Sequence, residues 1–304
     1  MGWLPPPWHA YPDAAGFEEA WKQVGSEAGA RSRVVGSSVE GRPIRCHEFG
    51  RPGGAPVLLS GLVHGIELVG SLALLEFVRA AVAEPSGELL RHCRLAVVPV
   101  VNPDALHENS ARIARGRRAY RRCNARGVDL NRNFPRLRDS LPWHPFGGSR
   151  WRRAMHYVGP HPLSEPETRA LRDVVDALRP RVSVGFHSFG ELLLYPWAFT
   201  ARPNPRRERY ERVGRAFVRE LRGMTYRTMQ AKEWYTTVGD LDDWLDAAYG
   251  TMAFTVEVSR PLRRLSNLRR LSNPFAWSNP VDLEGAVTGI APGIGALVRE
   301  ALAA

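Results

Sequence analysis

The chain has 304 residues, of which 44% are hydrophobic and 24% are charged, a composition that supplies a full apolar core. Its net charge of +11 comes almost entirely from arginine. A basic surface favours nucleic acid, an anionic membrane or an acidic polymer as a partner. No nucleic-acid-binding module is visible, so we interpret the arginines as a solvated surface and expect no nucleic-acid partner.

The N-terminal residues and the cysteines exclude other classes of protein. Residues 1–17 are proline-rich and polar, without the apolar segment of a secretory signal, and we expect no membrane span. A cytoplasmic protein is therefore expected. The three cysteines, Cys46, Cys93 and Cys123, form no C-x-x-C pair, which argues against a disulfide framework. The sequence leaves the oligomeric state open.

The first third of the chain alternates predicted strands and helices. Leu72, Leu75, Val78 and Val82 share one face of a predicted helix because they recur at helical spacing. The apolar run before His64 predicts a buried strand that ends in the loop carrying this histidine. In chain order we predict a hairpin at 33–50, a strand at 56–62, a helix at 68–83, a strand at 95–101 and a turn at 102–104.

Residues 106–162 predict a long irregular region rich in Arg, Gly, Pro and Trp, and such regions in compact domains are usually functional or disordered. Ser164-Glu-Pro-Glu167 then has the pattern of a capping box, with Ser164 as N-cap and Glu167 reaching back, and predicts a helix to about residue 178. The remaining predicted elements are a strand at 182–187, a helix at 206–221, a strand at 224–229, a short helix at 241–247, a strand at 252–258 and a helix at 284–302 that Pro292 breaks or kinks.

This alternation predicts an α/β fold, with a mostly parallel sheet covered by helices on both faces. No internal repeat or linker divides the chain, so we predict one domain over residues 1–304. Within it we distinguish an N-terminal extension at 1–30 and a C-terminal segment at 261–304 that ends in a helix.

His64, Glu67 and His187 form a candidate zinc site. Catalytic zinc takes three protein ligands, commonly two histidines and a glutamate, and keeps a fourth position for water. His64 and Glu67 could chelate one ion from a tight loop, and His187 follows a buried strand. Sites in open α/β sheets collect at the carboxyl ends of strands, where both histidines are predicted. The alternatives are a turn residue for His64 and a core histidine for His187.

Further motifs in the chain resemble those of zinc metallocarboxypeptidases of the carboxypeptidase A/B type, as in a compact bacterial member. The motifs run in the family's order from about residue 33 to 260. They are Val39-Glu-Gly-Arg42, Gly61-Leu-Val-His-Gly-Ile-Glu67, Asn102-Pro-Asp104, Tyr120-Arg-Arg122, Gly127-Val-Asp-Leu-Asn-Arg-Asn-Phe-Pro135, Ser164-Glu-Pro-Glu-Thr168, His187-Ser188, Leu194-Tyr-Pro196, Asp243-Trp244 and Phe254-Thr-Val-Glu257. The Asn-Arg-Asn-Phe and Ser-Glu-Pro-Glu-Thr runs are the most specific.

The resemblance implies a twisted, mixed sheet flanked by helices, one Zn²⁺ per chain and a peptide substrate with a free C-terminal carboxylate. It also implies a role for each matching residue. His64, Glu67 and His187 would bind zinc, and Glu257 would be the general base. Asn131 and Arg132 would hold the substrate carboxylate, Arg121 would stabilise the oxyanion with Arg122 as its competitor, and Tyr235 would cap the substrate.

The chemistry explains why these residue types are needed. Zinc lowers the pKa of a bound water to near 7, and a carboxylate such as Glu257 can take its proton and deliver it to the leaving amine. An unpaired charge at the end of the core-like run 254–258 would otherwise be costly. The planar fork of Arg132 suits a carboxylate, and Arg121 would face charge that develops only in the transition state.

Asp242 leaves two substrate classes open. It lies at the position where the family sets side-chain preference, and an acid there resembles the carboxypeptidase B arrangement, which favours C-terminal Lys or Arg. Alternatively, Asp242 is simply one of the acids at a helix N-terminus. A second function is cleavage of γ-D-glutamyl-diaminopimelate bonds in murein peptides, whose free amino group would also pair with Asp242. A catalytically silent binding module is the third.

Overall fold

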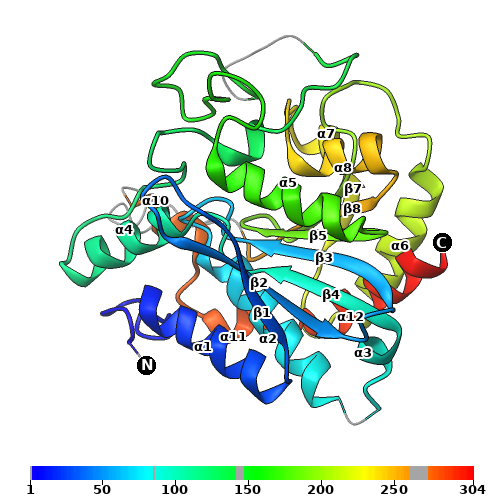
Figure 1. The fold of residues 1–304 in the computed structure, drawn as a ribbon, viewed down its shortest axis with the longest axis horizontal. Helices are drawn as coiled ribbons and strands as arrows, with labels where there is room; N and C mark the ends of the chain where they lie inside the picture. The colour runs from blue at the N-terminus through cyan, green and yellow to red at the C-terminus, as the bar shows by residue number, and fades with distance from the viewer. Residues whose placement is uncertain (1, 85, 142–146, 261–272) are drawn as a thin grey trace.

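The computed structural model describes residues 2–84, 86–141, 147–260 and 273–304. A twisted, eight-stranded mixed sheet with the order β1-β2-β4-β3-β5-β8-β6-β7 forms its centre (Figure 1). Neighbouring strands from β4 to β8 in this order are parallel, and β1, β2 and β6 add the antiparallel pairings. The strands are β1 (Arg31–Ser37), β2 (Pro43–Gly50), β3 (Ala55–Gly61), β4 (Cys93–Val98), β5 (Val182–His187), β6 (Leu192–Tyr195), β7 (Arg227–Gln230) and β8 (Met252–Glu257).

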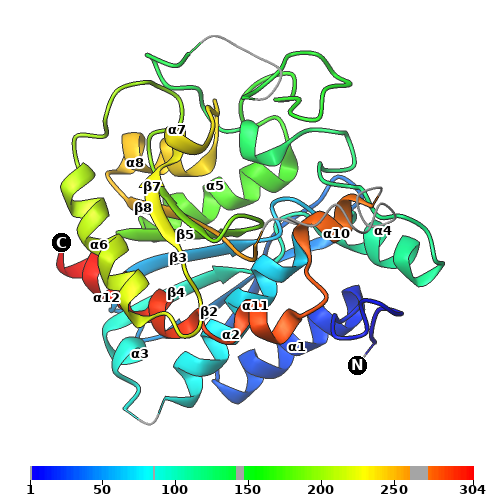
Figure 2. The ribbon, with the colours of Figure 1, turned by 180° about the vertical axis from the view of Figure 1, so that it is seen from behind.

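Helices cover both faces of the sheet, as predicted from the alternating pattern (Figures 1 and 2). One face packs against α1 (Ala14–Glu27), α2 (Leu68–Ala83), α6 (Arg207–Glu220), α11 (Leu283–Val287) and α12 (Ala291–Ala303). The other face packs against α5 (Pro166–Leu178) and α8 (Leu241–Tyr249). The remaining helices are α3 (Glu88–His92), α4 (Pro103–Ala114), α7 (Ala231–Trp234), α10 (Pro274–Ser278) and the 3₁₀ turn Leu130–Arg132.

The apolar pattern of the sequence explains this layered core. All six residues of β5 are buried because both faces of this central strand are covered, which is why it reads as an almost uninterrupted apolar run. In α5, Leu171, Val174 and Leu178 lie on one buried stripe while the opposite side is polar. Burial of each such side chain contributes about 1.5–3 kcal/mol to folding. The predicted α/β fold class is confirmed.

The structure corrects the predicted turn at residues 102–104, which is the start of helix α4. The Asn102 side chain caps this helix by accepting a hydrogen bond from the backbone N–H of Ala105 at 3.2 Å, and Pro103 occupies the first turn. The irregular region therefore begins only after Ala114. Asparagine followed by proline is compatible with a turn and with a helix start, and packing decides between them.

The predicted capping box at 164–167 is also wrong. Glu165 is the N-cap residue of α5, and its side chain makes no capping hydrogen bond. Glu167 instead accepts a hydrogen bond from the backbone N–H of Val39 at 3.0 Å. Its carboxylate therefore ties α5 to the turn between β1 and β2, a long-range contact that local capping rules cannot reveal.

The two ends of the described chain bear on the remaining predictions. The predicted N-terminal extension holds α1, which buries Phe17 and Trp21 against the core. The predicted break in the C-terminal helix is confirmed, because α11 ends at Val287 and α12 begins at Ala291 with Pro292 in its first turn. By length and hydropathy alone, Leu283–Ala303 passes as one candidate membrane span, but 56% of its most apolar 18-residue window is buried inside the fold. Residues 261–272 of the predicted C-terminal segment lie outside the described residues.

Candidate active site

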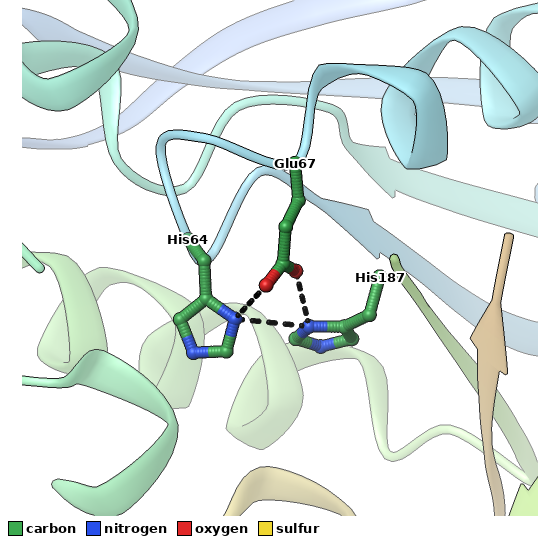
Figure 3. A group of neighbouring side chains, drawn as sticks. All are labelled: His64, Glu67 and His187. Carbon is green, nitrogen blue, oxygen red and sulfur yellow. Dashed lines mark hydrogen bonds and ion pairs between the residues drawn. The ribbon is translucent and has the colours of Figure 1, made fainter. Parts of the chain in front are cut away.

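The sheet brings the three predicted metal ligands together (Figure 3). His64 and Glu67 lie in the short loop between β3 and α2, and His187 is the last residue of β5. Glu67 is 2.9 Å from His64 Nδ1 through one carboxylate oxygen and 3.0 Å from His187 Nδ1 through the other. The two Nδ1 atoms are 3.2 Å apart. The parallel neighbours β3 and β5 end at the same edge of the sheet, which explains how residues 120 positions apart converge.

The donor set fits a catalytic zinc ion. Two imidazoles and one carboxylate, all buried, point their donor atoms toward a common centre, and this is a set that zinc takes while a fourth position stays open. Burial opposes ionisation of Glu67, but the His64 and His187 imidazoles outweigh this effect and hold the pKa of its carboxyl below the usual range. Glu67 is therefore an ionised ligand.

Gly65 allows the tight loop of the site to approach α4. A Cβ atom at this position would lie 2.2 Å from the Cβ of Ala105, which is closer than any real contact. The loop between His64 and Glu67 therefore has room for glycine only.

Asp129 orients His64 from behind and was not singled out from the sequence. Its Oδ1 atom lies 3.1 Å from His64 Nε2, so the imidazole donates its Nε2 proton there and keeps the Nδ1 lone pair for a metal. Burial raises the pKa of Asp129, but the Arg122 and Arg132 guanidinium groups outweigh this and hold it well below the usual range. Its position within the motif Gly127–Pro135 was the available signal.

The structure favours Arg122 over Arg121 as the arginine that faces the metal ligands. The Arg121 side chain donates to Glu108 at 2.6 Å, outside the pocket. Arg122 lines the pocket, pairs with Asp129 and approaches His64 Nδ1 to 3.4 Å. The Asn109 side chain accepts a hydrogen bond from the backbone N–H of Arg121 and donates one to its carbonyl. With the backbone held in this way, the Arg121 side chain turns toward α4 and the Arg122 side chain turns toward the metal ligands.

Arg132 and Tyr235 form a site for an anion. Arg132 is only 2% exposed, and its Nη1 donates a hydrogen bond to the Asn131 carbonyl at 2.6 Å. Its Nε and Nη2 atoms are buried without a partner among the described residues. The Tyr235 ring centroid lies 5.8 Å from the Arg132 guanidinium carbon. A buried guanidinium with unsatisfied N–H groups is costly, and a carboxylate would satisfy them bidentately.

Asn131 lies at the wall of the pocket between the anion site and α8. Its side-chain Oδ1 accepts a hydrogen bond from the backbone N–H of Leu241 at 3.1 Å. This bond leaves the side-chain N–H₂ group free to donate to a ligand.

Glu257 ends β8 and is the register partner of His187. Its side chain lines the pocket and is largely buried. Burial, assisted by the charge of Glu67, raises the pKa of Glu257 to about 8 against the opposing effect of His187. A carboxylate in this environment accepts a proton readily, as a general base must.

Of the three aspartates that line the pocket, Asp242 has the fewest hydrogen-bond donors within the protein and can therefore bind a substrate. Asp240 caps α8 at the N–H of Asp243 and accepts from Thr237, and Asp243 accepts from the backbone of residues 198 and 199. Among the described residues, the Asp242 side chain accepts a hydrogen bond only from the Thr255 hydroxyl, at 2.5 Å. Burial raises the pKa of Asp242 to about 7.

A pocket of about 290 Å³ connects the metal ligands with Asn131, Tyr235 and Asp242, and Arg132 is not among its lining residues. Its lining includes the metal ligands, Arg122, Asn131, Tyr235, Asp242 and Glu257. It also includes His156, whose Nδ1 lies 3.0 Å from Asp129 Oδ2 and which no sequence signal had indicated because it lies in an irregular loop.

Comparisons with known proteins identify the family of this chain. Residues 18–266 match the family model described as zinc carboxypeptidase. Mouse carboxypeptidase A6 is 31% identical over 229 residues, which cover 69% of this chain and 51% of the relative. Carboxypeptidase B of Astacus astacus is 31% identical over 178 residues, covering 55% of this chain and 57% of the relative. This chain thus spans a little over half the length of these relatives.

Solved structures show the same fold. Carboxypeptidase A from Helicoverpa armigera superimposes with a TM-score of 0.75 at 21% identity, covering 95% of this chain and 72% of that one. The metallo-carboxypeptidase from Burkholderia cenocepacia superimposes with a TM-score of 0.63 at 16% identity, covering 94% and 69%. On the extent of the family match and the convergence of its motifs in one pocket, this chain belongs to the zinc carboxypeptidase family.

Proposed function

We propose that this protein is a zinc-dependent metallocarboxypeptidase that hydrolyses the last peptide bond of its substrates. The arrangement of two sites carries this proposal. A two-histidine, one-glutamate metal site shares a pocket wall with Glu257, and the buried, unsatisfied guanidinium of Arg132 lies close by at Tyr235. A free C-terminal carboxylate at Arg132 places the last peptide bond of a peptide near the metal ligands.

The metal ligands, Glu257 and Arg122 each have a separate role in the reaction. Zinc, when bound by His64, Glu67 and His187, supplies the Lewis acidity that activates water and polarises the carbonyl. Glu257 accepts the proton of the attacking water and delivers it to the leaving nitrogen. Arg122 donates to the oxygen that becomes negatively charged in the transition state.

Substrate binding uses the other end of the pocket. Arg132 and the Asn131 amide hold the terminal carboxylate, and the Tyr235 side chain, at the C-terminal end of α7, covers it. Asp242 faces the last side chain of the substrate. A lysine or arginine side chain there satisfies the carboxylate that Thr255 alone satisfies now, so we propose a preference for basic C-terminal residues.

A peptide panel tests the function. Peptides ending in Lys, Arg, Phe, Leu and Glu, with a γ-D-glutamyl-diaminopimelate peptide beside them, are incubated with the zinc-loaded protein. We expect chelator-sensitive release of the last residue, fastest from Lys and Arg, and its recovery when zinc is restored. Release from the murein peptide alone would establish the second function. The absence of any release from a folded, zinc-loaded protein would overturn the enzymatic proposal and favour a binding module.

A further inference from the structure

The basic charge of this chain is concentrated in one segment. Residues 110–163 contain thirteen arginines and two aspartates, so their net charge of +11 equals that of the whole chain. The chain has 42 basic and 31 acidic residues, which leaves 29 of each outside the segment. Arginines that only reflected the composition of the genome would be spread along the chain. The scarcity of acidic residues to offset the arginines of this segment indicates a local role.

Two loops of this segment carry exposed arginines without a carboxylate partner among the described residues. In the same loops, Arg121 and Arg126 do have partners, in Glu108 and Glu165. The aromatic residues Tyr120 and Trp151 lie among the unpaired arginines in the sequence and are 54% and 66% exposed. We call the unpaired group the arginine rim, and it consists of Arg115, Arg117, Arg118, Arg150, Arg152 and Arg153.

The two loops that carry the arginine rim reach the active-site pocket, while Arg117 and Arg118 themselves line a separate surface hollow with Tyr120. The Cys123 thiol donates to the Met155 carbonyl at 3.2 Å and holds the two loops together. One residue from each loop, Arg122 and His156, lines the pocket. Figure 1 shows α4, from which the first of these loops leaves, on the opposite side of the molecule from α6 and the C-terminus.

The direction of the bound substrate follows from the proposed function, on which this inference rests. Arg132 holds the terminal carboxylate, Asp242 receives the last side chain, and Arg122 faces the carbonyl of the scissile bond. The residues before that bond therefore leave the pocket near Arg122, between the two loops that carry the arginine rim.

We propose that the arginine rim binds acidic side chains of the substrate on the N-terminal side of the scissile bond. Guanidinium groups pair bidentately with carboxylates, and a rim of one sign beside a pocket raises the rate of association with an oppositely charged ligand by about tenfold or more. The preferred substrate is thus a peptide with an acidic segment before its last residue. Continuity of the rim with a peptide-binding pocket favours this partner over a nucleic acid.

Matched peptides test the inference. Two peptides end in the same residue and differ only in three upstream positions, which are Glu in one and Gln in the other. We expect kcat/KM to be about tenfold higher for the Glu peptide at low salt, and this advantage to vanish at about 0.5 M NaCl because the charges are exposed and screened. Equal values for the two peptides at low salt would overturn the proposal.

Variants locate the effect. The substitutions Arg117→Ala, Arg118→Ala, Arg152→Ala and Arg153→Ala together should lower kcat/KM of the Glu peptide to that of the Gln peptide, which itself should not change. The matched control replaces Arg209 and Arg215, two exposed arginines of α6 outside the segment, with Ala. A preserved Glu preference in the rim variant, or its loss in the control, would contradict the assignment.

A binding measurement separates this inference from the proposed function. If neither peptide is hydrolysed, the function fails, and fluorescence anisotropy of a labelled Glu peptide with the Glu257→Gln protein still tests the rim. Weaker binding by the rim variant would support the inference. Tighter binding of single-stranded DNA or of anionic phosphatidylserine vesicles than of the Glu peptide would overturn the choice of partner.

Discussion

His187 and Glu257 are register partners on the neighbouring parallel strands β5 and β8. Backbone hydrogen bonding between these strands therefore places a metal ligand next to the proposed base. Both side chains line the same pocket. The relative position of ligand and base is thus built into the most buried part of the sheet, and a rigid scaffold of this kind is what a preorganised site requires.

The first prediction concerns Glu257. Glu257→Gln removes proton transfer but preserves the size of the side chain, so kcat should fall by about 10²- to 10⁴-fold. Zinc content and the KM for peptides should change little, because neither the ligands nor Arg132 is altered. Stopped assays with metal analysis measure both quantities. The exposed Glu220→Gln serves as control, and undiminished kcat in Glu257→Gln would exclude this glutamate as the base.

The second prediction compares the two adjacent arginines. Arg122→Ala should lower kcat by about 10²- to 10³-fold, as loss of an oxyanion donor does. Arg121→Ala should change kcat less than about threefold, because this side chain pairs with Glu108 outside the pocket. Steady-state kinetics of both variants decide the matter. The reverse order of effects would restore Arg121 as the oxyanion residue.

The third prediction concerns the buried guanidinium of Arg132. Wild-type protein should discriminate strongly between a peptide with a free carboxylate and the same peptide with a C-terminal amide. Removing one partner of a buried charged pair costs about 2 kcal/mol or more, roughly 30-fold in kcat/KM. Arg132→Gln should lose activity on the free acid and lose the discrimination as well. The exposed Arg138→Gln is a control that should keep both.

The fourth prediction links Asp242 to pH. Since the pKa of Asp242 is raised to about 7 by burial, its carboxyl is neutral below that pH and charged above it. The ratio of kcat/KM for Arg-ending to Leu-ending peptides should therefore rise with pH through about 7. Ionisations common to both substrates cancel in this ratio. Asp242→Asn should make the ratio low and independent of pH, and a sloping profile in this variant would point to another group.

The fifth prediction concerns stability. His47 of β2 is buried, stacks on Trp21 at 5.7 Å between ring centroids, and contacts the Ser32 hydroxyl at 2.7 Å. Burial lowers the pKa of His47 from 6.5 to about 4. The unfolded chain therefore binds a proton between these values while the folded chain does not, so stability is present above pH 6.5 and is lost as the pH falls.

Urea unfolding of the metal-free protein at pH 7.5 and pH 5 measures this effect. His47 should account for a loss of about 2 kcal/mol in the free energy of unfolding. His47→Gln should show a smaller loss than the wild type, whereas the exposed His92→Gln should match the wild type. Equal pH dependence in all three proteins would show that His47 is protonated without penalty.

Much of the fold and of the site could be predicted from sequence because the signals are local. The spacing of apolar residues predicted α2 and, within a residue, α6. His64 and Glu67 are three residues apart in one loop, and the order of motifs from Val39 to Glu257 identified the family. Helix periodicity and motif residues lie within short stretches of chain, so they can be recognised without knowing which elements pack against them.

Long-range packing decided the rest. Arg121 and Arg122 are adjacent and identical in chemistry, and only the contacts of Asn109 and Asp129 with these two residues determine which one faces the metal ligands. Likewise, Glu167 has the three-residue spacing from Ser164 that is typical of a capping box, but its carboxylate accepts a hydrogen bond from the backbone N–H of Val39 instead. A sequence motif specifies which side chain is present, whereas its direction depends on where the backbone and neighbouring elements are held after folding.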